Sequence, residues 1–214
     1  MLLAVVVVLL ATGCGGSSTD TTTTSADTMT VRIYLLRDGK VWPVSREIEK
    51  PDGLLNPVLE DALVAGPTDA EKQLGLTTEV TRDPTKPSRA ALAQTVYTYS
   101  QLDPNEPVNV GDKNYTRADF EDQTPLILVE SPLAFDQVSS PLRVTGTANT
   151  FEATFQYELV DAEGNVVDKN FVTATSGTGT RGTVARRSKW LTGASISSCV
   201  LLMAPRACTR SRVE

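Results

Sequence analysis

The chain has 214 residues, enough for two small domains, because independent domains usually run about 100–200 residues. It contains no histidine, so the commonest general base and the commonest metal ligand are both absent. The net charge of −6 is unevenly spread: residues 1–180 hold 13 basic and 25 acidic side chains, whereas residues 181–214 hold seven basic and one acidic. An acidic body of this kind argues against nucleic acid or anionic lipid as the main partner.

The first 13 residues predict an export signal. Residues 2–11 are an unbroken apolar run, which suits the hydrophobic region of a signal peptide and is shorter than the roughly 20 residues of a membrane-spanning helix. Small residues then precede Cys14, and this arrangement resembles the lipobox of bacterial lipoproteins. The resemblance implies cleavage before Cys14 and attachment of lipid, such as palmitate, to its thiol. We therefore expect a lipid anchor in the cell membrane, with the chain on the extracytoplasmic face.

Residues 14–28 are expected to form a flexible stalk. They consist mostly of Gly, Ser, Thr and Asp, and such a segment cannot bury enough apolar surface to offset its chain entropy. The other two cysteines, Cys199 and Cys208, lie near the end of the chain and could form a disulfide in an oxidising compartment.

Residues 29–115 predict a small domain that begins with a hairpin. Two β-rich runs, 30–36 and 41–48, flank an Asp-Gly turn at Asp38. Apolar residues at helical spacing then predict a helix over 56–65, which the following Gly-Pro ends.

A second helix is predicted over residues 88–102, with Ser88 as its cap. A proline-containing loop leads into it, and a strand is expected at 108–110. Residues 116–124 are polar and are expected to form a linker to the next domain.

Residues 125–183 predict an antiparallel β-sandwich. Short runs of largely alternating apolar and polar residues are separated by turn signals, which is typical of this architecture. The expected strands cover residues 126–130, 141–148, 151–160 and 166–175. The overall fold class is therefore α+β, with a small α/β domain followed by the sandwich.

The tail, residues 184–214, differs from everything before it. It is basic, contains two cysteines and is expected to lack strand alternation. Two interpretations stay open: a shifted reading frame, or a basic tail that contacts anionic lipid or wall polymer.

Several segments resemble known families. Residues 44–48 (Val-Ser-Arg-Glu-Ile), 63–68 and 92–98 resemble the GerMN domain of sporulation and spore germination proteins. Relative to that family, the domain is expected to be internally shortened around residues 80–88. The segments 129–132 and 140–148 (Ser-Pro-Leu-Arg-Val-Thr-Gly-Thr-Ala), together with 151–153 and 175–182, resemble the immunoglobulin-like domain that often follows it. The expected immunoglobulin-like domain, 125–183, is incomplete by comparison with that family.

Carboxylates offer the main candidates for chemistry. Glu60 with Asp61, and Asp119 with Glu121 and Asp122, could serve as acid and base in glycoside cleavage. Sequence neighbours on a helix point in different directions, so solvated surface charge is the better account. The acidic residues of the segment 161–168 could hold calcium, but they fit a hairpin turn better.

Other motifs carry little chemistry. No Gly-x-Ser-x-Gly motif occurs, and Ser188 beside Lys189 lies in the atypical tail. The glycine-rich segment 177–182 lacks the lysine of a phosphate loop and is expected to be a loop at the end of a strand. The aromatic residues of the first domain are expected to pack in its core rather than stack on sugars. They are Tyr34, Trp42, Tyr97 and Tyr99.

We expect a non-catalytic lipoprotein with no metal, no cofactor and no nucleic-acid partner. Its expected partners are the membrane, through Cys14, and a cell-wall polymer such as peptidoglycan or envelope proteins. The alternatives are a carboxylate-dependent cell-wall enzyme and a self-associating envelope scaffold subunit.

Overall fold

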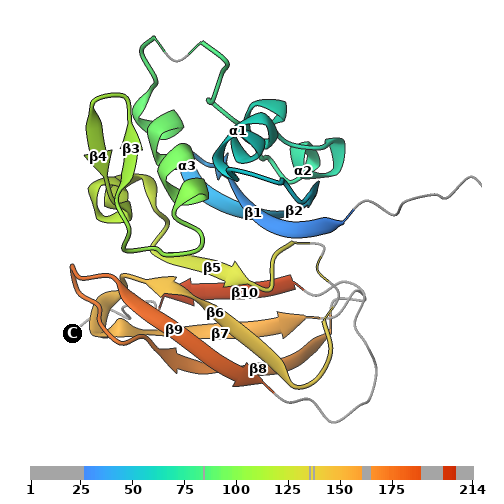
Figure 1. Ribbon diagram of the computed structural model, residues 1–214. Coiled ribbons are helices and arrows are strands. Elements are labelled where there is room, and N and C mark those ends of the chain that lie inside the picture. The colour runs from blue at the N-terminus through green and yellow to red at the C-terminus, as the bar shows by residue number, and fades with distance from the viewer. Residues whose placement is uncertain are drawn as a thin grey trace, which may run out of the picture.

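The computed structural model describes residues 27–83, 85–134, 136, 138–160, 165–188 and 200–205. Figure 1 shows an N-terminal part, in which the helices lie around strands β1 and β2, and a C-terminal part built from strands β5 to β10. The signal peptide, Cys14, Cys199 and Cys208 lie outside the described residues. In the part of the chain that is described, no helix is long and apolar enough to cross a membrane.

The N-terminal part begins with the predicted hairpin. Strands β1 (Thr28–Arg37) and β2 (Lys40–Glu49) pair antiparallel along their whole length. The two turn residues, Asp38 and Gly39, have φ angles of 51° and 71°, as the favoured two-residue hairpin turns require. The Asp-Gly signal is thus confirmed.

Strand β1 is buried on both faces, although its sheet has only two strands. Alternate side chains of a strand point to opposite faces. Val31, Ile33 and Leu35 pack with α1 (Asn56–Ala65), whereas Tyr34 and Leu36 pack with α3 (Arg89–Tyr99). The apolar run that predicted a strand is therefore continuous because both of its faces meet a helix.

The two predicted helices form where their end signals place them. Helix α1 ends at Gly66, whose φ of 72° suits a residue without Cβ. Helix α3 begins after Ser88, whose hydroxyl accepts the Ala91 N–H at 3.0 Å, and it ends three residues before the predicted limit. The short helix α2 (Asp69–Gln73) was not predicted, although Thr68 and Glu71 form a capping box at its start.

The segment expected to be a polar linker is folded. After the short hairpin of β3 (Val108–Val110) and β4 (Lys113–Tyr115), the 3-10 helix η1 (Arg117–Gln123) packs against α3. Its one large apolar side chain, Phe120, is fully buried in the same cluster as Tyr34. The first folded region therefore extends to residue 123, and Phe120 packs this mostly polar segment into the core.

The C-terminal part contains two antiparallel sheets. The strand orders are β5-β6-β9 and β10-β7-β8. Side chains from both sheets share one buried cluster, in which Ala148 and Val184 of the first sheet meet Phe155 and Tyr157 of the second. The bounds are β5 Ile127–Ser131, β6 Leu142–Ala148, β7 Thr154–Val160, β8 Val166–Thr173, β9 Gly182–Ser188 and β10 Val200–Pro205, with the 3-10 helix η2 at Phe151–Ala153.

Two strands extend into the tail that was expected to lack them. Strand β9 pairs with β6 at every residue, from Gly182 opposite Ala148 to Ser188 opposite Leu142. Strand β10 pairs with β7. The expectation was wrong for these residues, because exposed Thr183, buried Val184 and exposed Ala185 alternate and the two arginines that follow also pair with β6.

Candidate functional site at the domain junction

The free edge of β1 is completed by side chains of α3 and the turn that follows it. The Tyr34 N–H donates to the Thr98 hydroxyl at 3.0 Å, and the Arg32 N–H donates to the Gln101 side-chain oxygen at 2.8 Å. The Gln94 amide donates to the Tyr34 carbonyl at 3.0 Å. Gln94, Thr98 and Gln101 are spaced by four and three residues, so they lie on one side of the helix. These polar side chains are buried because they take the place of a neighbouring strand.

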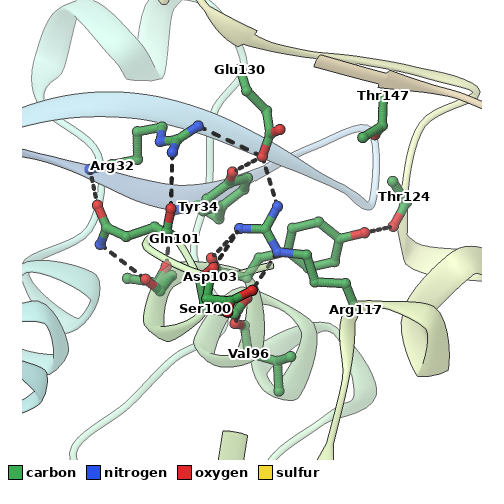
Figure 2. A network of polar contacts seen from close by, with 12 residues as sticks. Arg32, Tyr34, Val96, Ser100, Gln101, Asp103, Arg117, Thr124, Glu130 and Thr147 are labelled. Carbon is green, nitrogen blue, oxygen red and sulfur yellow. Dashed lines mark hydrogen bonds and ion pairs between the residues drawn. The ribbon is translucent and has the colours of Figure 1, made fainter. Parts of the chain in front are cut away.

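Arg117 of η1 lies at the centre of a polar network at the junction of the two parts (Figure 2). Its Nε donates to the Ser100 hydroxyl at 2.8 Å, and its Nη2 donates to the Tyr97 carbonyl at 3.1 Å. The guanidinium carbon lies 4.7 Å and 5.3 Å from the ring centres of Tyr97 and Tyr34. Stacking and hydrogen bonds therefore hold this cation in one orientation.

Glu130 of β5 brings the C-terminal part into the network. Its Oε1 accepts the hydroxyl of Tyr34 and accepts Arg117 Nη1 at 2.7 Å, and Arg32 Nη1 lies 3.8 Å away. The side chains of Arg117 and Glu130 are only 11% and 12% exposed. Figure 2 shows that the three partners approach this carboxylate from the N-terminal part. The junction thus contains a buried ion pair, which binds one part to the other.

The surroundings shift the titration of these groups. Burial alone raises the pKa of Glu130, but the positive charge of Arg117 and the hydrogen bonds from Tyr34 and Arg117 outweigh it, so the pKa lies below its usual value. Burial and the nearby Glu130 carboxylate raise the pKa of Tyr34. Glu130 is therefore ionised at neutral pH and Tyr34 is protonated, as a donor must be.

A second ion pair joins η1 to the loop between β8 and β9. Arg181 Nε and Nη2 donate to the two carboxylate oxygens of Glu121 at 2.8 and 2.9 Å, and Nη2 also donates to the Pro125 carbonyl at 2.8 Å. Asn149 donates to the same carboxylate at 2.8 Å. Burial raises the pKa of Glu121, but the hydrogen bonds from Arg181 and Asn149 lower it by more.

The other candidate carboxylates remain apart. Asp61 pairs with the exposed Arg82 at 3.0 Å, and Asp122 pairs with Arg89 at 2.6 Å. Asp119 accepts the Thr116 N–H at 2.7 Å. The structure therefore places these groups on the surface, each with its own partner, and Glu121 alone among the candidates reaches the junction.

The remaining motifs fall mostly where the sequence placed them. Tyr34 and Tyr97 are buried, as predicted, and Trp42 is half-buried beneath Arg37. Residues 177–181 lie in a loop after strand β8, as predicted, and Gly182 begins β9. Of the acidic turn, residues 161–164 lie outside the described residues, and Asp168 accepts the Tyr157 hydroxyl at 2.6 Å. Among the described residues there is no cluster of acidic, cysteine or histidine side chains that could hold a metal ion.

A groove of about 890 Å³ runs along the junction. One side comes from the N-terminal part and includes Asn105 and Arg117, and the other comes from β6, β9 and the loop before β9. Its volume lies in the range of sites that bind small molecules or segments of a polymer. Both parts of the molecule therefore contribute to this concave surface.

The strands beside this groove carry the similarity to known proteins. Residues 126–185 match Gmad2, the immunoglobulin-like domain of bacterial spore germination. The match confirms the immunoglobulin-like resemblance and includes β5, β6, β7 and β8 and the first residues of β9. No curated protein and no solved structure matches the chain. We use the name immunoglobulin-like domain for this region below.

Sequence reasoning did not identify Arg117, Glu130 or Arg181 as junction residues. Their partners lie far along the chain: Tyr34 is 96 residues from Glu130, and Glu121 is 60 residues from Arg181. One signal was present, because Gln94, Thr98 and Gln101 form a polar stripe beside the apolar stripe of α3. A solvent-exposed face produces the same pattern, so the stripe alone does not reveal its burial.

Proposed function

We propose that the protein is a non-catalytic, membrane-anchored extracytoplasmic lipoprotein with a role related to sporulation or germination. Lipid attached to Cys14 anchors it, and the GerMN-like and immunoglobulin-like units together bind cell-wall polymer or envelope proteins. In this proposal the two C-terminal sheets are the two layers of the immunoglobulin-like sandwich. The observation that carries the proposal is the match of residues 126–185 to the spore germination domain.

The junction supports binding rather than catalysis. Its charges, the buried Arg117 with Glu130 and the partly exposed Arg181 with Glu121, are paired with each other at hydrogen-bond distance. A catalytic acid or base needs a group that can reach a substrate proton. Groups held in this way instead fix the two units in one arrangement and keep the groove between them in a constant shape.

A sedimentation assay tests the binding role. The full chain, purified in detergent, is incubated with insoluble peptidoglycan, and both the bound protein and the released soluble fragments are measured. We expect the protein to sediment with the peptidoglycan without releasing fragments. Fragment release would favour a cell-wall enzyme, and concentration-dependent self-association without binding would favour a scaffold subunit.

Metabolic labelling tests the anchor. We expect radiolabelled palmitate in the wild-type protein and none in a Cys14→Ala variant expressed at the same level. Cys199→Ala is the matched control and should keep its label. An unlabelled wild-type protein would contradict the lipoprotein assignment.

A further inference from the structure

Two arginines lie together on the outer face of strands β6 and β9, and one of them, Arg143, lines the groove. Arg143 of β6 lies directly opposite Arg187 of β9 in the antiparallel register, and both side chains are exposed. Side chains in such pairs have Cβ atoms about 4.5–5.5 Å apart, and like charges placed this way destabilise a sheet. No described residue forms a hydrogen bond, an ion pair or a ring contact with either guanidinium.

The rest of the groove makes this pair distinctive. Arg143 lines the groove, and so do Arg117 and Arg181, but those two are neutralised by Glu130 and Glu121. The charge left without a partner in the lining is therefore positive, although the whole chain has a net charge of −6. A local field of this sign attracts an anion to one end of the groove.

The protein's own ion pairs indicate which anion fits. In Arg46–Glu71 and in Arg181–Glu121, one guanidinium bonds both oxygens of a carboxylate, with both contacts at 2.6 Å in the first pair. A carboxylate can pair with two arginines, as Glu130 does with Arg117 and Arg32, but its two oxygens lie in one plane and on one side of the carbon. A phosphoryl group has tetrahedral oxygens that accept from two sides, and arginine is suited to it.

We propose that Arg143 and Arg187 bind a phosphoryl group of an anionic cell-envelope polymer whose chain lies in the groove. The proposal rests on the proposed function and specifies its ligand class. A groove of about 890 Å³ is much larger than one phosphate group, which favours a polymer segment over a free ion. The hydroxyls of Thr145 and Thr183, also in the lining, can bond the units next to the phosphoryl group.

Binding of a glycerol-phosphate oligomer tests the site. With the full chain in detergent, we expect calorimetry to show binding that weakens as salt is added. Arg143→Gln and Arg187→Gln should each weaken binding roughly tenfold, since each removes a charge-assisted contact. Arg82→Gln is the matched control: it removes an equal charge from an exposed arginine that pairs with Asp61 outside the groove, and its affinity should stay within about twofold of wild type.

Other outcomes would overturn the assignment. Equal losses in Arg143→Gln and Arg82→Gln would show a nonspecific charge effect. If poly-glutamate bound as tightly as the oligomer, the site would recognise carboxylates rather than a phosphoryl group. If the protein bound phosphatidylglycerol vesicles but not the oligomer, the ligand would be a lipid rather than a polymer. Sedimentation with peptidoglycan stripped of its phosphate polymers tests the proposed function separately. If the wild-type protein binds this peptidoglycan but does not bind the oligomer, the phosphoryl site is rejected and the proposed function stands.

Discussion

The N-terminal part and the immunoglobulin-like domain complete their strands in different ways. At the edge of β1, side chains of Thr98, Gln101 and Gln94 provide the hydrogen bonds that a neighbouring strand would provide. In the immunoglobulin-like domain, β6 pairs with β5 on one side and with β9 on the other, backbone to backbone. The first region therefore depends on the identity of a few buried polar side chains, and the second depends on how closely its backbones approach.

The junction between the two regions should be the most sensitive point. Arg117→Met removes a buried cation and leaves Glu130 without its main partner, so we expect a loss of about 3–5 kcal/mol in the free energy of unfolding. Urea denaturation measures this. Arg89→Met, which breaks a pair that is about half exposed on both sides, should cost much less. Equal losses would mean that the buried pair contributes no more than a surface pair.

Close backbone approach in the immunoglobulin-like domain can be tested at Gly146. A Cβ atom added there would lie 2.1 Å from the Leu128 carbonyl oxygen of the adjacent strand, so Gly146→Ala should destabilise the protein by about 3 kcal/mol. Gly53→Ala is the control, since its Cβ would meet no atom within 4 Å. A thermal denaturation midpoint that is the same in both variants would show that β5 and β6 can move apart without cost.

The edge of β1 should respond to a change that preserves shape. Thr98→Val removes only the hydroxyl that accepts the Tyr34 N–H, and the unpaired N–H should cost about 1–3 kcal/mol. Thr95→Val is the matched change on the same helix, where the half-buried hydroxyl bonds the Ala91 carbonyl of its own helix. The prediction fails if the two variants unfold at the same urea concentration.

Acid should weaken the junction through its two carboxylates. The pKa values of Glu121 and Glu130 are lower in the folded protein than the usual value of about 4.3 that the unfolded chain retains. Their contribution to stability is therefore fully present above that pH and is lost as the pH falls below it. Urea denaturation from pH 7 to pH 3 should show this loss of stability. In Glu121→Gln, the free energy of unfolding should fall less steeply with decreasing pH. A slope that is the same in Glu121→Gln and in the wild-type protein would contradict this account.

Much of the secondary structure could be predicted from local signals. The Asp38-Gly39 turn, Gly66 at the end of α1 and Ser88 at the start of α3 act within a few residues of themselves, so their effect is visible in the sequence. Strand β9 was not predicted, because its two arginines interrupt the apolar alternation by which a strand is recognised in the sequence. Helix η1 was missed because Phe120 alone distinguishes it from a polar linker.

The sequence by itself determined where the hairpin, the two main helices and most strands of the immunoglobulin-like domain form, since turn, cap and periodicity signals are local. Only the tertiary structure decided which charges meet. Arg117, Glu130, Glu121 and Arg181 look like ordinary surface residues in the sequence, and they pair across the junction only when segments up to 96 residues apart come together. The same holds for Arg143 and Arg187, whose register across two strands places two positive charges side by side. A charged residue attracts any opposite charge within reach, so its partner is defined by the fold rather than by its neighbours in the chain.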